Sequence, residues 1–248
     1  MDKPGKTSPL SWLVYVITAL ILVFFLARLE IRSNVQKAEF QHRAARLLVS
    51  VRRYYAAGPV FTRWGNNRCP YRSYRVYEGI MGGQDKTHRG GASNFLCLPR
   101  RPTWANLKGG SQLGGLIYGT QYKLYPAHVN GFGLFITTHL KPPHNHDVPC
   151  AVCQVTKPAT VLMIPGRKVC TPGWDLMYRG YLMSEKRNNA GRMTYVCVDK
   201  RPQVYWAGYL NENGATINHV ESKCGSLPCP LYSNYKEVPC CVCSKCPI

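Results

Sequence analysis

The chain has 248 residues, and its 32 Lys and Arg against 12 Asp and Glu give a net charge of +20. A hydrophobic content of 45% with 18% charged residues excludes an intrinsically disordered chain. The charge favours polyanionic partners such as acidic glycans, acidic lipids or nucleic acid, although a basic surface can also serve solubility alone.

The N-terminus predicts a membrane anchor. Residues 1–9 are a short, polar segment, and we expect them to form a cytoplasmic tail. Residues 10–27 are uncharged, and a helix of this length, at about 1.5 Å per residue, just crosses a hydrocarbon core of roughly 30 Å. An uncleaved signal anchor is favoured over a signal peptide, because only half of a small-x-small cleavage site is present at Ala27. Cleavage would instead give a secreted form.

A helical stalk is expected over residues 28–57, because Pro and Gly are absent until Gly58-Pro59. Apolar and small residues recur there with the 4-3-4-3-4 spacing of a coiled-coil seam: Ile31, Val35, Ala38, His42, Ala45 and Val49. The seam is weak, so the pattern leaves open either a short coiled coil or a single amphipathic spacer helix.

From Pro59 onward, short β-branched and aromatic runs are separated by Gly, Pro and Asn, which is typical of antiparallel β structure. Strands are predicted at residues 60–62, 116–118, 134–138, 161–164 and 194–198. We therefore expect a mainly β ectodomain.

The chain contains an internal duplication. The hexapeptide Val-Pro-Cys-Ala-Val-Cys at 148–153 returns as Val-Pro-Cys-Cys-Val-Cys at 238–243. The copy extends upstream, where residues 59–69, 76–81 and 94–102 align on residues 160–170, 177–182 and 194–202. This predicts two tandem disulfide-stapled β repeats, at 58–157 and 158–248.

Twelve cysteines in small β repeats favour a disulfide framework and an oxidising compartment. The alternative is zinc, because Cys-x-x-Cys is also a ligand spacing. We expect all twelve to form disulfides: Cys69, Cys97, Cys150, Cys153, Cys170, Cys197, Cys224, Cys229, Cys240, Cys241, Cys243 and Cys246. Pairing is expected to match between the repeats.

The charges that flank the apolar segment leave its orientation open, and the cysteines place the C-terminal part outside, as in a type II protein of the plasma membrane. That location argues against nucleic acid as a partner.

A run of motifs over residues 59–245 resembles the cysteine-rich C-terminal domain of sponge short-chain collagens and related aquatic-invertebrate proteins. The motifs lie at 62–65, 69–70, 90–99, 144–153, 161–165, 180–183 and 224–230. The resemblance implies an extracellular, matrix-related domain. Short-chain collagens carry Gly-X-Y repeats before this domain, and this chain has none.

Little in the sequence points to catalysis or to a cofactor. His144-Asn145-His146-Asp147 could hold a metal, but a hydrophilic lead-in to the strand that bears Cys150 explains it as well. A Gly-x-Ser-x-Gly elbow and paired carboxylates are lacking, so we expect no enzyme. Trp and Tyr residues could line a sugar-binding surface or pack between β layers. The tryptophans in question are Trp64, Trp104, Trp174 and Trp206.

The leading hypothesis is a membrane-anchored, matrix-type binding or adhesion protein that engages a matrix protein or polyanionic glycan through its basic ectodomain. The alternative is a structural scaffold that trimerises without a small ligand. A carbohydrate-active enzyme or a lectin is the third and weakest option.

Overall fold

A computed structural model describes residues 9–55, 58–104, 114–124, 135–136, 143–205, 208 and 210–246. The chain divides into two compact units, residues 1–55 and residues 56–248. Each unit is described by itself.

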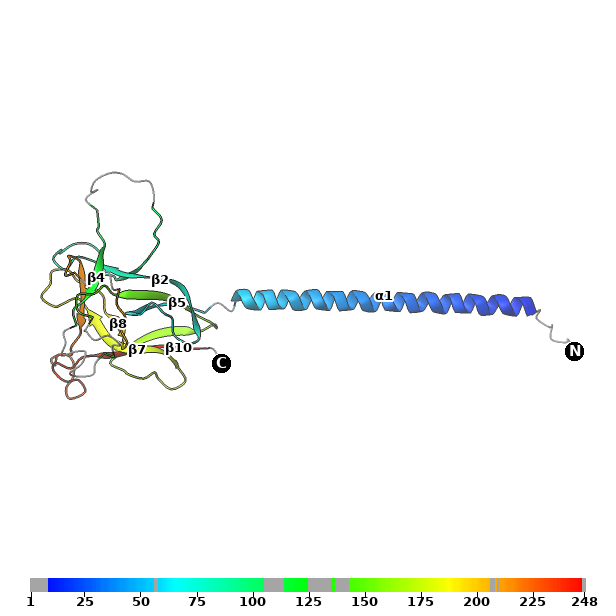
Figure 1. Cartoon of the computed structure of the whole chain (residues 1–248). Coiled ribbons are helices and arrows are strands. Elements are labelled where there is room, and N and C mark those ends of the chain that lie inside the picture. Colours follow the sequence, from blue (N-terminus) through cyan, green and yellow to red (C-terminus); the bar gives the residue numbers. More distant parts are fainter. Residues whose placement is uncertain are drawn as a thin grey trace. The chain divides into compact units, whose positions relative to one another are not determined.

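The first unit contains one long helix, α1, over Pro9–Tyr55 (Figure 1). The segment Trp12–Leu47 is long and apolar enough to cross a membrane. A signal sequence near the N-terminus has the same properties. The predicted N-terminal apolar helix is thus confirmed. The helix continues through residues 28–55 without a break, and at about 1.5 Å per residue it is roughly 70 Å long. A stalk or coiled-coil role for its second half stays a prediction.

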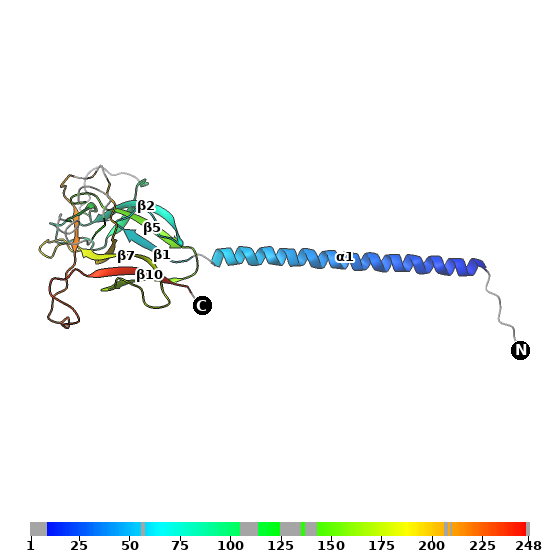
Figure 2. The same cartoon turned by 60° about the horizontal axis from the view of Figure 1, so that its bottom comes forward.

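The second unit is mainly β, as predicted. Its described residues form ten strands: β1 (Val60–Trp64), β2 (Ser73–Gly83), β3 (Leu96–Pro99), β4 (Tyr118–Tyr122), β5 (Pro149–Val155), β6 (Thr160–Pro165), β7 (Asp175–Ser184), β8 (Val196–Asp199), β9 (Ala215–His219) and β10 (Pro239–Lys245). They form one sheet in the order β6-β10-β7-β8-β1-β5-β2-β4-β9, with β3 on β2 (Figures 1 and 2). Because β9 also pairs with β7, the seven strands from β7 to β9 in this order form a closed ring of paired strands.

The two halves of the sequence share this sheet. β1 from the first half meets β8 from the second in parallel, with Trp64 opposite Val198. β4 and β9 also pair in parallel, with Thr120 opposite Ala215. The boundary predicted between residues 157 and 158 therefore falls inside one compact unit, and the assignment of two domains there stays a prediction.

The register of strand pairing recurs in the two halves. β5 lies between β1 and β2, and β10 lies between β6 and β7. Gly79 on β2 is opposite Cys150 on β5, and Gly180 on β7 is opposite Cys240 on β10. These are the positions that the sequence alignment equates.

Both glycines are required by close backbone approach. A Cβ at Gly79 would lie 1.9 Å from the carbonyl oxygen of Leu98, and one at Gly180 would lie 1.7 Å from that of Val198. Such distances are far inside van der Waals contact, so any larger residue would separate β2 from β3, or β7 from β8.

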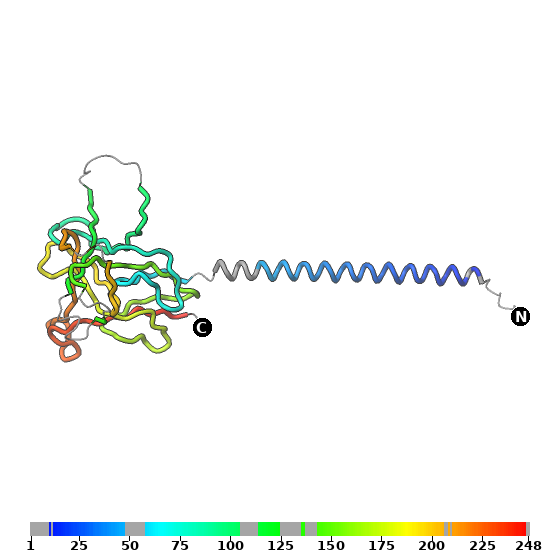
Figure 3. Tube along the Cα trace, in the orientation of Figure 1, coloured from blue at the N-terminus to red at the C-terminus, as the bar shows by residue number. Residues whose placement is uncertain are grey.

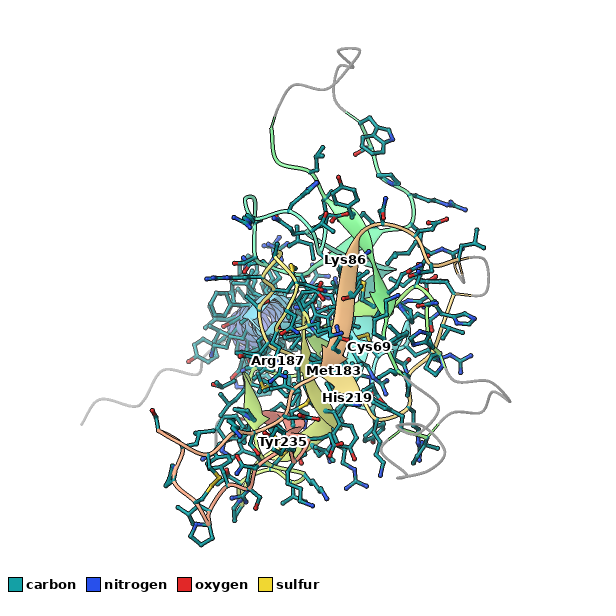
Figure 4. The ribbon with its side chains drawn as sticks, turned by 90° about the vertical axis from the view of Figure 1, so that its left-hand side faces the viewer. Cys69, Lys86, Met183, Arg187, His219 and Tyr235 are labelled. Atoms are coloured by element: carbon teal, nitrogen blue, oxygen red, sulfur yellow. A yellow bond between two sulfur atoms is a disulfide. The ribbon has the colours of Figure 1, made fainter. Side chains whose placement is uncertain are left out.

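A hydrophobic cluster drawn from both halves fills the space between the strands. Its largest fully buried members include Tyr122, Met81, Met183 and Ile217. In Figure 4, Met183 and His219 are labelled where β7 and β9 pair. This shared core explains why residues 56–248 form one compact unit.

Some predicted strands differ from the observed ones. Residues 60–62 and 161–164 lie in β1 and β6, whereas β4 begins only at Tyr118 and β8 only at Val196. Of the strand expected at 134–138, only residues 135–136 are described, and they are not in a strand. The two longest strands, β2 and β7, were not predicted as strands, because polar residues, Arg and Gly interrupt their apolar runs.

Five disulfides staple the β unit. They join Cys69 to Cys153, Cys97 to Cys150, Cys170 to Cys243, Cys197 to Cys240 and Cys224 to Cys229. The first and third, and the second and fourth, occupy aligned positions of the two halves. The expectation of six bridges needs correction, because Cys241 and Cys246 are free. Cys241 is buried in β10, and Cys246 is partly exposed just beyond the end of that strand.

Candidate functional site

A basic cleft of about 800 Å³ lies at one end of the β unit. It is bounded by Arg89 and by the loop of residues 185–195 that joins β7 to β8. Its lining residues are Arg89, Ser184, Glu185, Lys186, Arg187, Asn189, Ala190, Gly191, Arg192, Met193 and Tyr195. Lys86 and Arg187, labelled in Figure 4, mark the two loops that border it.

The 185–195 loop lies beside the loop of residues 84–93 (Figure 3), and backbone hydrogen bonds join the two loops. The amide of Gly191 donates to the carbonyl of Lys86 over 3.0 Å, and the amide of Thr194 donates to that of Ser93 over 2.7 Å. A Cβ at Gly191 would lie 2.4 Å from the carbonyl oxygen of Asp85, so this contact requires glycine. The cleft is thus built on a fixed arrangement of two loops.

The only acid in the lining, Glu185, is held by hydrogen bonds to its own loop and to β9. Its Oε2 accepts from the amide of Thr216 over 2.9 Å, and its Oε1 accepts from Asn189 Nδ2 over 2.8 Å and from the Thr216 hydroxyl. This carboxylate organises the loop, and its lone pairs are largely occupied within the protein.

Four cations of the cleft have no acidic partner within 4.0 Å among the described residues. The ion pairs found in that part of the chain involve other arginines. They are the exposed side chains of Arg89, Lys186, Arg187 and Arg192. Tyr195 beside them is 63% exposed. A concave surface with several unpaired cations and one acid raises the local concentration of anions and can bind sulfate or carboxylate groups.

A second, smaller basic cavity of about 130 Å³ lies against β7 and includes Lys168, Arg179 and Lys200. The first half of the chain places Glu78 where Arg179 stands, and Glu78 pairs with Arg100 at 3.4 Å. The second half has a cation at the position of this acid, and that position is part of a positively charged surface there.

The histidine cluster that we considered as a metal site forms a tight turn. The amide of His146 donates to the carbonyl of Pro143, and Asn145 has a positive φ of 60°. The Asp147 amide donates to the carbonyl of Gly208 over 2.9 Å, and burial raises the pKa of the Asp147 carboxyl. The turn leads into β5, as the alternative interpretation expected.

The tryptophans that the structure describes in the β unit do not gather into one surface. Trp64 packs against the hydrophobic clusters, whereas Trp104 is 77% exposed. Trp174 is half-buried, and Trp206 lies outside the described residues.

Sequence reasoning did not locate the basic cleft. The adjacent Lys186-Arg187 and the nearby Arg192 are visible in the sequence, but such short basic runs occur throughout a chain of charge +20. Arg89 is almost a hundred residues away from them. These cations differ from the others because they line one cleft, and because Glu185, the acid in that lining, accepts hydrogen bonds from the protein itself.

The sulfurs of Cys170, Cys241 and Cys243 lie within 4.8 Å of one another, and within the described part of the chain they are the one group of three side chains with metal-ligating geometry. Two of them are joined as a disulfide. No known protein-family model matches the chain.

Proposed function

We propose that this chain is a single-pass, type II plasma-membrane protein whose extracellular β unit binds an acidic glycan of the matrix. The observation that carries the proposal is the 800 Å³ cleft with four unpaired cations. The net charge of +20 and the resemblance to a matrix domain of short-chain collagens support it. Carboxylate and sulfate groups of a glycan would contact the cations, and a sugar ring could stack on Tyr195.

The disulfides support the extracellular location. Bridges of this number are rare in the cytosol, where thiols are kept reduced. With the β unit outside, residues 10–27 would span the bilayer and residues 28–55 would act as a helical stalk.

The test is the salt concentration at which full-length protein in detergent elutes from heparin, a sulfated glycan. The variant R187Q/R192Q removes two cations of the cleft, and K157Q/K245Q removes two exposed cations outside it. We expect the cleft variant to bind roughly tenfold more weakly, since each contact contributes about 0.5 to 1 kcal/mol.

Equal elution of the two variants would show that any binding is diffuse. Elution of the wild type with a neutral control protein would refute polyanion binding.

A second candidate function, a self-associating scaffold, is favoured by the pairing of β1 with β8. This contact joins an edge of the first half to an edge of the second. If the halves arose by duplication, β6 is the counterpart of β1, and β3 is the counterpart of β8. Among the described residues, neither β6 nor β3 has a partner on its second edge. The same contact could therefore form between copies, as β6 of one on β3 of the next.

The side chains at these two edges suit such a contact. Arg63 on β1 pairs with Asp199 on β8, but the equivalent positions hold Ile164 on β6 and Pro99 on β3. Leu162 on β6 and Leu96 on β3 are 46% and 52% exposed. A head-to-tail contact of this kind closes into a ring, such as a trimer, when its rotation permits.

Native mass spectrometry of the full-length protein in detergent tests self-association. We expect Leu162→Lys to reduce the oligomer to a monomer, while Leu231→Lys, in an 84% exposed loop residue, leaves it intact. A wild-type monomer at micromolar concentration would reject the scaffold proposal without affecting glycan binding.

A further inference from the structure

A free thiol lies against a disulfide in the second half of the β unit. The Sγ atom of Cys241 is 3.6 Å from that of Cys243, which is bonded to Cys170. The three sulfurs lie within 4.8 Å of one another. A thiol and a disulfide in contact are the two reactants of thiol–disulfide exchange.

The first half of the chain has the same disulfide without the thiol. There Cys69 is bonded to Cys153, and Ala151 occupies the position that corresponds to Cys241. Ala151 is fully buried, so a methyl group suffices to pack this site. The thiol of Cys241 is therefore an addition that the packing does not require.

The surroundings limit what the thiol of Cys241 can react with. Cys241 and Cys243 are fully buried in β10, between β6 and β7, so solvent reagents have no access to either. A register shift between Val242 and Cys243 bulges the strand at this point. The disulfide is the electrophile that Cys241 touches.

We propose that Cys170, Cys241 and Cys243 form an exchange site that moves a free thiol from the core to the surface. The Cys241 side chain first turns so that its sulfur lies in line with the Cys170–Cys243 bond. Its thiolate then attacks Cys243 Sγ, a Cys241–Cys243 bond forms, and the Cys170–Cys243 bond breaks. Cys170 leaves with the electron pair and takes the proton that Cys241 released. One disulfide and one thiol remain, so no external oxidant or reductant is needed.

The direction of attack follows from contact and from solvation. Cys241 Sγ contacts Cys243 Sγ at 3.6 Å, and Cys170 is partly exposed, so water stabilises the leaving thiolate. Burial raises the pKa of the Cys241 thiol, which Arg167 lowers in part; Arg179 on β7 is its register partner. The thiol is thus mainly protonated at neutral pH, and the reaction is slow there.

The product has a surface thiol on residues 166–174, a largely exposed segment between β6 and β7. This thiol can attack a disulfide of another chain, so that it forms a mixed disulfide with one cysteine of that bridge and releases the other as a thiol, which Cys241 in the core cannot do. The site would then cross-link the protein covalently. This inference is independent of glycan binding and of self-association through β6.

The test is a thiol map of full-length protein in detergent. The native protein is kept at pH 6 or pH 9, quenched with acid, denatured, alkylated with N-ethylmaleimide and digested with trypsin without reductant. Before exchange, the peptide of residues 169–179 that contains Cys170 stays linked to β10. After exchange it is released with one alkyl group on Cys170. We expect release to increase at least about fivefold from pH 6 to pH 9.

The variant Cys241→Ala is the matched control, because it reproduces the buried Ala151 of the first half. Release should be lost in this variant, while Cys246, which is free and partly exposed, is alkylated in both proteins. The proposal is overturned if the label remains on Cys241 at pH 9, or if it moves to Cys243 with the peptide still linked. Release from Cys241→Ala would equally overturn it, since hydroxide would then be the nucleophile.

Discussion

At the scale of single residues, one buried ion pair joins the two halves of the β unit. Arg63 Nη2 and Nε lie 2.5 and 2.7 Å from Asp199 Oδ2, and the two side chains are only 15% and 5% exposed. The amide of Arg201 also donates to Asp199 Oδ1 over 2.8 Å. Removing one charge would leave the other buried without a partner.

We expect Asp199→Asn to lower the free energy of unfolding by about 3 kcal/mol. Urea denaturation with the disulfides intact measures the change. The control is Asp175→Asn, whose pair with Arg72 is 51% and 57% exposed, and which should change stability by less than about 1 kcal/mol. Equal effects would show that Arg63 and Asp199 do not act as a buried pair.

Asp147 makes stability depend on pH. Burial raises the pKa of its carboxyl in the folded state, and nearby Glu212 raises it further, against the opposing effects of Gln121 and His146. The folded state therefore binds the proton more tightly than the unfolded chain. The contribution of this carboxyl to stability is greatest below the unfolded pKa of about 4 and is lost as the pH rises through the folded value.

The variant Asp147→Asn should remove this loss, because an amide does not titrate. Its melting temperature should fall less than that of the wild type between pH 4 and pH 6. The Asp147 amide would still donate to Gly208. An unchanged pH profile would show that another group causes the dependence.

At the scale of elements, the hairpin of β7 and β8 carries the cleft, and its loop depends on close approach to residues 84–93. Gly191→Ala would place a methyl group 2.4 Å from the carbonyl oxygen of Asp85. We expect the loop to shift and the salt needed for heparin elution to fall. Gly90→Ala, in the opposite loop, meets nothing within 4 Å and should bind as the wild type does. Loss of binding in both variants would argue against a specific loop contact.

At the scale of the whole molecule, the disulfides differ in how much chain they close. Cys97 and Cys150 are 53 residues apart, whereas Cys224 and Cys229 are 5 apart. Loop-closure entropy then contributes about 4 kcal/mol in the first case and about 2 kcal/mol in the second. The longer bridge also joins β3 to β5 within the core.

Replacing Cys97 and Cys150 by Ser should therefore lower the melting temperature more than replacing Cys224 and Cys229. Thermal unfolding of the two double variants, monitored by circular dichroism, measures the difference. A larger effect from the short bridge would mean that the 224–229 turn supports the core more than its exposed position indicates.

Local sequence patterns determined several features of this protein. Eighteen uncharged residues predicted the apolar helix, and β-branched runs predicted a mainly β unit. Such patterns are reliable because they depend on neighbouring residues and on burial of one face. The repeated hexapeptides also predicted equivalent cysteines, and the pairs Cys69–Cys153 and Cys170–Cys243 fall at equivalent positions.

Only the tertiary structure decided which parts of the two halves meet. β1 lies on β8 and β4 lies on β9, so both halves share one core. The same packing brings Arg89 to the 185–195 loop, and it places the free thiol of Cys241 beside the disulfide of Cys243. These contacts join residues far apart in the chain, and they depend on how the side chains of all strands fill the core together. Neither spacing nor composition contains that information, because a local pattern is compatible with many long-range arrangements.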